Sequence, residues 1–158
     1  MTTTHPTLGE ARLPRNPLLS EVLALVSKQK TKAKKIQTLK EYESLHLKSV
    51  LIWNFDESVK SMLPDGDVPF KKNDAPAGTE HLHLAYEWKK LYNFVKGGND
   101  VLRPMKREQL FMQLLEGLHP DEAEIICLVK DKNLKKKYKL TRAIVEEAFP
   151  DIQWGNRS

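Results

Sequence analysis

The stretch LFMQLLEGLHPDEAEIICLVKDKNLKKKYKLTRAIVEEAFP, from Leu110 to Pro150, decides the fold of this chain. It predicts two helices that meet at His119 and Pro120, a basic connector, and a third helix that begins after Thr141 and stops at Pro150. Each helix carries apolar residues three and four positions apart, which is the spacing of one buried helical face. The stretch therefore indicates helices that pack against one another.

The connector carries an excess of six positive charges, which exceeds the net charge of +5 of the whole chain. Seven cationic residues stand there against one acid, Asp131: they are Lys130, Lys132, Lys135, Lys136, Lys137, Lys139 and Arg142. Thr141 lies next to the last of them and suits an N-cap. A basic loop before a helix N-terminus predicts a phosphate site, because lysines supply the field and the free N–H groups of the first turn supply directed donors.

Two further basic sets lie at predicted helix ends. One set surrounds the start of a predicted helix at Pro104 and consists of Arg103, Lys106 and Arg107. The other set occupies residues 30–35, at the junction of two predicted helices. Several basic helix ends suit contact with the phosphate backbone of DNA without reading its bases. The alternative interpretation of each set is a solvated helix face, since lysine runs are common on such faces. Tyr138, inside the connector, either stacks on a nucleic acid or packs against its own protein.

The remaining sequence predicts a single all-α domain of about seven helices over residues 19–150. Ser20, Thr31 and Ser44 are expected to begin helices as N-caps, and another helix is expected from Thr79 to about Val95. Residues 1–18 contain three prolines and are expected to form an extended arm. Residues 63–78 are rich in Pro, Gly and Asp and predict a long loop.

Residues 151–158 form the expected C-terminal tail, in which Trp154 is the one large aromatic residue. Two interpretations of Trp154 remain open at the level of sequence. The side chain either anchors the tail to the domain or contacts a partner.

The sequence contains no recognisable motif of an enzyme active site. There is no Gly-rich phosphate loop, and the five histidines are scattered without the spacing of metal ligands. Cys127, the one cysteine, stands between Ile126 and Leu128 and is expected to be a small core residue. We expect no catalytic residue, no metal and no cofactor, although Asp65 and Asp67 fit either a turn or a cation.

The sequence also indicates the compartment. No apolar run approaches the roughly 20 residues of a membrane span, and the first residues lack the apolar core of a signal peptide. We therefore expect a soluble intracellular protein with no membrane partner.

Taken whole, the chain resembles a family of small uncharacterised proteins encoded by contractile-tailed, myovirus-type bacteriophages. The phrases that carry the resemblance are IWNFDESVKSMLPDG, LYNFVKGGND, QLLEGLHPDEAEIICLVKDKNL and EEAFPDIQWGNRS, and they span nearly everything from Ser20 onward. The resemblance implies a phage protein in the cytoplasm of its host, or one associated with the virion.

More distantly, residues 20–150 are similar to the N-terminal helical DNA-binding domain of phage ATP-dependent DNA ligases. The similarity runs through EVLALVSKQKTKAKKIQTLKEY, LHLKSVLIWNF, and KDKNL before a final helix that ends in AFP. It implies a domain that grips duplex DNA through phosphate contacts. The corresponding positions here are Lys130, Lys132, Lys135, Lys139, Thr141 and Arg142.

Two departures from the ligase pattern are present. Lys139-Leu140 stands where the ligases usually have a glycine before the last helix. The Lys-x-Asp-Gly motif that accepts the nucleotide is missing, because Asp65-Gly66 follows Leu63-Pro64.

The sequence therefore predicts a non-enzymatic phage accessory protein that binds duplex DNA without sequence specificity. The alternative hypothesis is an adaptor that contacts a phage replication protein, a virion protein or a host protein.

Overall fold

The computed structural model describes residue 13, residues 16–75 and residues 81–157. The expected arm of residues 1–18 and the expected helix start at Thr79 lie largely outside them. In the described residues, the chain forms seven α-helices and two 3₁₀ helices. The α-helices are α1 (Leu19–Lys28), α2 (Lys32–Glu41), α3 (Leu45–Phe55), α4 (Leu84–Glu87), α5 (Pro104–Gly117), α6 (Pro120–Lys130) and α7 (Arg142–Ala148). The 3₁₀ helices are η1 (Trp88–Phe94) and η2 (Leu134–Lys136).

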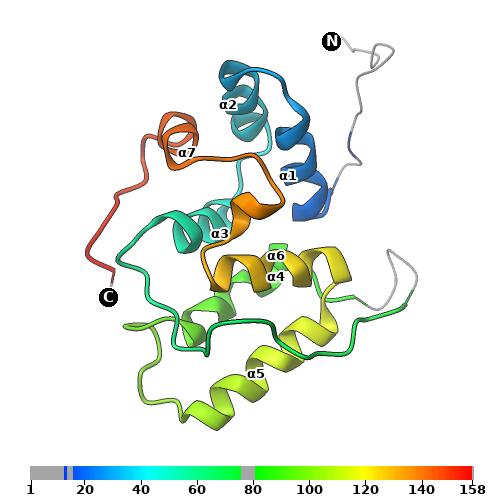
Figure 1. The fold of residues 1–158 in the computed structure, drawn as a ribbon, viewed down its shortest axis with the longest axis vertical. Coiled ribbons are helices and arrows are strands. Elements are labelled where there is room, and N and C mark those ends of the chain that lie inside the picture. Colours follow the sequence, from blue (N-terminus) through cyan, green and yellow to red (C-terminus); the bar gives the residue numbers. More distant parts are fainter. Residues whose placement is uncertain (1–12, 14–15, 76–80, 158) are drawn as a thin grey trace.

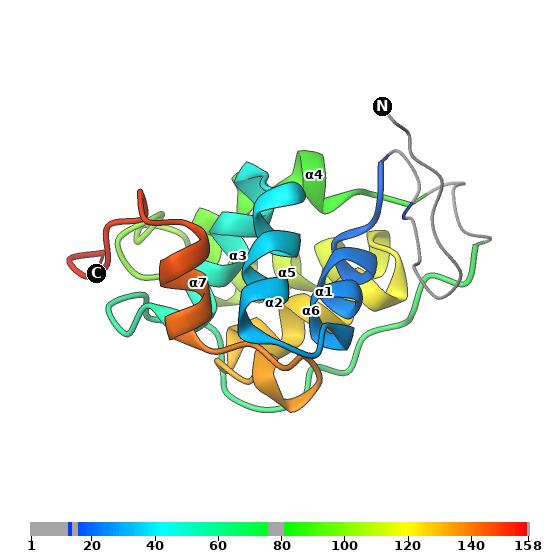
Figure 2. The same ribbon diagram turned by 90° about the horizontal axis from the view of Figure 1, so that it is seen from above.

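The predicted all-α class is confirmed: the same residues contain two isolated β-bridges and no strand. Helix α6 packs against α1, α3 and α5 and so lies at the centre of the arrangement. Helices α1, α2 and α7 lie side by side at one end of the molecule, and α5 forms the opposite end (Figures 1 and 2). One continuous hydrophobic cluster joins all of these helices.

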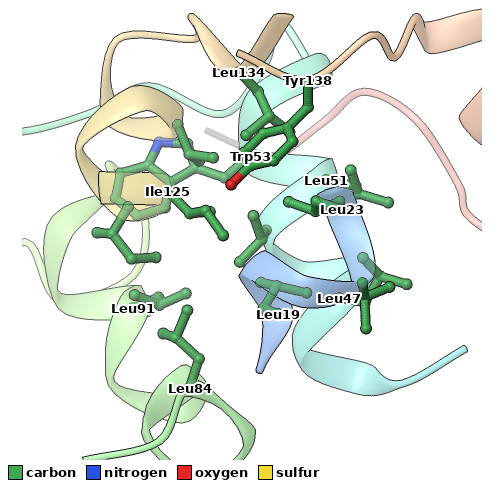
Figure 3. Packing of buried hydrophobic residues seen from close by; sticks show 14 of the residues in the cluster. Leu19, Leu23, Leu47, Leu51, Trp53, Leu84, Leu91, Ile125, Leu134 and Tyr138 are labelled. Atoms are coloured by element: carbon green, nitrogen blue, oxygen red, sulfur yellow. The ribbon is translucent and has the colours of Figure 1, made fainter. Parts of the chain in front are cut away.

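Trp53 of α3 lies near the middle of this cluster, beside Ile125 of α6 and the side chains of Leu134 and Tyr138 (Figure 3). Leu134 and Tyr138 belong to the basic connector, which is therefore held onto the core by its apolar residues. Tyr138 is 3% exposed, so packing within the protein is the correct one of its two interpretations.

Three of the predicted N-caps are confirmed. The side-chain oxygens of Thr31, Ser44 and Thr141 accept hydrogen bonds from backbone N–H groups in the first turns of α2, α3 and α7. The prediction for Ser20 was wrong, because α1 already begins at Leu19 and Ser20 is buried within it. Glu122 of α6 accepts the Leu19 N–H instead, so a distant residue helps to fix where α1 starts.

The expected single helix up to Val95 was also wrong. Residues 81–83 are extended, and the Leu82 N–H donates to the Gly117 carbonyl over 2.7 Å. A turn of α-helix, α4, follows and continues into η1, whose seven residues are a long run for a 3₁₀ helix. Contact with the end of α5 therefore overrides the helical pattern of this segment.

No helix in the described part of the chain has the length and apolar character needed to cross a membrane.

Candidate nucleic-acid interface

Two hydrogen bonds join the basic connector to the junction of α1 and α2. Lys35 Nζ donates to the Lys139 carbonyl over 2.7 Å, and the Lys139 N–H donates to Ser27 Oγ over 3.1 Å. Figure 2 shows the connector (orange) passing the turn between α1 and α2 (blue). The fold thus brings together two basic segments that are about a hundred residues apart in the sequence.

Six lysines on these segments have exposed side chains and form no ion pair with any carboxylate of the described residues. We call these six exposed lysines of the two adjoining segments the basic face: Lys28, Lys30, Lys34, Lys135, Lys136 and Lys139. Lys28 ends α1, and sequence reasoning missed it because one lysine at a helix C-terminus is ordinary. Its position beside the connector depends on the tertiary fold.

Ion pairs border the basic face. Lys32 Nζ lies 2.7 Å from Glu147 Oε1, Arg142 Nε lies 3.2 Å from Glu146 Oε1, and Lys137 is paired with Glu124. The hydrogen bond from Lys137 to Glu124 raises the pKa of Lys137. These cations are partly neutralised, so they contribute less to the field of the face than the six unpaired lysines do.

Thr141 and Arg142 lie at the edge of the face, but both are engaged. Thr141 Oγ1 accepts the Ile144 N–H, and the Arg142 guanidinium lies 4.6 Å from the centre of the Trp154 ring. Helix α7 has seven residues, and its cap already occupies one N–H of the first turn. The lysine side chains, rather than this helix N-terminus, therefore dominate the site.

Trp154 anchors the tail. The ring packs against the core cluster and Arg142, and the next residue donates its Gly155 N–H to Asp56 Oδ2 over 2.9 Å. Arg157 pairs with the same carboxylate at 3.5 Å. Of its two interpretations, Trp154 therefore fits the docked anchor.

Asp56 holds this tail from a position that is 2% exposed. Burial by itself would raise the pKa of Asp56. Hydrogen bonds from Ser58 and Gly155, together with the charge of Arg157, outweigh burial and hold the pKa below its ordinary value.

Two connector lysines predicted to bind phosphate are structural, which corrects the prediction. Lys130 is 2% exposed, and its Nζ donates to the Pro64 carbonyl and to Asp131 Oδ1, each over 2.7 Å. Lys132 Nζ donates to the carbonyls of Trp53 and Asp56 at the end of α3. Both ammonium groups satisfy backbone carbonyls, and desolvation lowers the pKa of Lys132.

The set near the start of α5 lies far from the basic face, because α5 occupies the opposite end of the molecule (Figure 1). Arg103 and Lys106 are exposed there. Arg107 is 2% exposed and donates to the carbonyls of Asn93, Asn99 and Leu102 over 2.9–3.0 Å. The prediction that Arg107 contacts phosphate was therefore wrong, and the three sets do not share one face.

Groups of three or more His, Cys, Asp or Glu side chains placed to hold a metal ion do not occur in the described residues. Cys127 packs against the core cluster, and burial raises the pKa of its thiol to about 11. A thiol that stays protonated is a poor nucleophile.

Comparison with known proteins identifies a family. The chain belongs to a family described as "Family of unknown function (DUF6433)", whose sequence profile matches residues 22–136. Neither the curated proteins nor the solved structures contain a significant match. The resemblances to phage proteins and to ligase domains therefore stay predictions.

Proposed function

We propose that this protein binds duplex DNA without sequence specificity, through contacts between the lysines of the basic face and backbone phosphates. The observation that supports this proposal is the pair of hydrogen bonds from Lys35 to Lys139 and from Lys139 to Ser27. They place two basic segments side by side. Like charges repel, so a fold that gathers six unpaired lysines carries an electrostatic cost that a polyanion would remove.

Duplex DNA suits this face better than a small phosphate. The lysines come from the end of α1, the turn that follows it, the first turn of α2, η2 and the residues after η2, so they are spread over several segments rather than converging on one point. An extended lattice of phosphates can contact many of them at once. The large aromatic residues Trp53 and Tyr138 are buried, so the face lacks the stacking platform of a single-strand binder.

The salt dependence of binding measures the number of contacts. Each neutralised phosphate contributes a slope of about −0.9 in log K against log salt, so engagement of all six lysines gives about −5. We expect fluorescence anisotropy of a labelled duplex to show this steep dependence. Duplexes of different sequence should bind equally, because phosphates carry no direct sequence information.

A charge-reversal triple variant tests the site itself. Replacing Lys135, Lys136 and Lys139 by Glu should weaken binding more than about tenfold and reduce the salt slope by about three. The matched control has the same change in net charge: it replaces three exposed lysines outside the face by Glu, namely Lys60, Lys72 and Lys89. If both triples weaken binding equally, net charge rather than the basic face is responsible. If the wild-type protein does not bind duplex at low salt, the proposed function is wrong.

A further inference from the structure

The end of the molecule opposite the basic face displays two large apolar side chains. Val101 is 93% exposed and Met105 is 83% exposed. Val101 belongs to the loop before α5, and Met105 lies in its first turn. Arg103 and Lys106, both exposed, stand beside them. We call these four residues the tip.

The tip is built rigidly. The buried guanidinium of Arg107 donates to three carbonyls of residues 93–102, and Asp100 Oδ1 accepts the Gly97 N–H over 2.8 Å. Gly98 approaches Tyr92 so closely that an added Cβ would lie 2.0 Å from the Tyr92 carbonyl oxygen. Ordering a loop costs conformational entropy, so a loop fixed in advance binds a partner at a lower cost.

A pocket with the opposite character lies farther along the same helix. Its volume is about 270 Å³, and its apolar walls come from Leu63, Val68, Phe111 and Met112. Three acidic residues, Asp65, Asp67 and Glu108, and one cation, Lys130, also line it, so acids outnumber cations three to one. The loop wall is fixed as well, because Lys130 Nζ donates to the Pro64 carbonyl and Asp131 Oδ2 accepts the Gly66 N–H over 3.2 Å. We call this the acidic pocket.

We propose that a second copy of this chain covers this end, with the tip of each copy in the acidic pocket of the other. Charge complementarity supports this occupant: the tip is apolar and basic, and the pocket is apolar and acidic. The arrangement is also consistent with two-fold symmetry, since both features lie along α5. Two antiparallel copies of α5 put Met105 of each copy beside Met112 of the other, and bring the basic tip of each copy toward the acidic pocket of the other. Each contact then occurs twice.

Sedimentation equilibrium of the full chain, from low micromolar to several hundred micromolar, tests the proposal. The wild-type protein should pass from monomer to dimer, with a dissociation constant on the order of 10 µM for such a small interface. Replacing Met105 by Asp should raise this constant at least about tenfold. The control replaces Tyr86, which is 76% exposed on α4, by Asp and should leave the constant unchanged. Circular dichroism confirms that both variants are folded.

Charge exchange tests the two-fold arrangement specifically. The variants K106E and E108K should each dimerise more weakly, because K106E lowers the positive charge of the tip and E108K lowers the negative charge of the pocket that receives it. A mixture of the two should form a heterodimer. In this heterodimer the E108K copy keeps the basic tip and the K106E copy keeps the acidic pocket, so one of the two contacts retains its full charge complementarity.

Several results would overturn the proposal. A wild-type chain that stays monomeric at the highest concentration excludes the dimer. Co-sedimentation of this monomer with vesicles of anionic phospholipid, lost in the Met105→Asp variant, would instead assign the tip to a membrane surface. A dimer that tolerates Met105→Asp, or a mixture of K106E and E108K that stays monomeric, places the interface elsewhere.

Discussion

Replacing Glu122 by Ala should remove one of the strongest single contributions to the stability of this fold. The Glu122 side chain is 2% exposed, and its two oxygens accept different backbone donors. Oε2 accepts the Leu19 N–H over 2.9 Å, and Oε1 accepts the Leu84 N–H over 3.2 Å. Leu19 and Leu84 are the first residues of α1 and α4. One carboxylate thus holds the starts of two helices that lie far apart in the sequence.

The expected loss follows from these two bonds. A hydrogen bond to a charged group contributes about 1.5–3 kcal/mol, and a buried donor left without a partner costs about 1–3 kcal/mol. Because these amounts describe overlapping effects, we expect Glu122→Ala to lower the free energy of unfolding by about 3–5 kcal/mol. Glu122→Gln keeps one acceptor and should lose about half as much, since its NH₂ group faces the other donor.

Urea unfolding followed by circular dichroism measures both losses. The matched control is Glu41→Gln, because Glu41 is exposed at the end of α2 and its side chain forms no hydrogen bond or ion pair with the described residues. That control should change the free energy of unfolding by less than about 0.5 kcal/mol. A loss below about 1 kcal/mol for Glu122→Ala would refute the role of this carboxylate.

Two further predictions concern titrating groups. Cys127, whose thiol pKa is raised to about 11, should react with iodoacetamide at about pH 8 far more slowly in the folded chain than in urea; equal rates would contradict its burial. Asp56 has a folded-state pKa below its unfolded value, so its stabilising effect is complete above an unfolded pKa of about 4 and is lost as pH falls through the folded pKa. The free energy of unfolding should therefore drop more steeply between about pH 5 and about pH 2 in the wild type than in Asp56→Asn, and parallel curves would contradict this.

Sequence patterns predicted helix starts correctly where residues close in the sequence determine the local structure. Thr31, Ser44 and Thr141 cap helices because a short side chain can reach the first turn that follows it. Ser20 misled the prediction because α1 starts one residue earlier, where Glu21 accepts the Leu18 N–H and Glu122, 103 residues away, accepts the Leu19 N–H. The segment after residue 80 misled it for the same reason, since the Leu82 N–H is bound by the Gly117 carbonyl.

Charge patterning identified the candidate site only in part. It indicated Lys135, Lys136 and Lys139, which are exposed, but it could not separate them from Lys130 and Lys132. Whether a lysine faces solvent or satisfies a carbonyl depends on tertiary contacts, such as the one from Lys130 Nζ to the Pro64 carbonyl. A run of lysines in the sequence does not show which of them are exposed and which bind carbonyl groups.

The two proposals can fail independently because they concern opposite ends of the molecule (Figure 1). Reversing the charge of the connector lysines leaves the tip untouched, and Met105→Asp leaves the basic face untouched. Lys130 and Arg107, which the sequence assigned to phosphate, instead fix the two surfaces from which the dimer is inferred. Burying a cation costs desolvation energy, which the hydrogen bonds to carbonyl oxygens offset, and the same bonds fix the loops that display charged and apolar side chains. The positive charges of Lys130 and Arg107 therefore stabilise loops of the protein rather than bind a ligand.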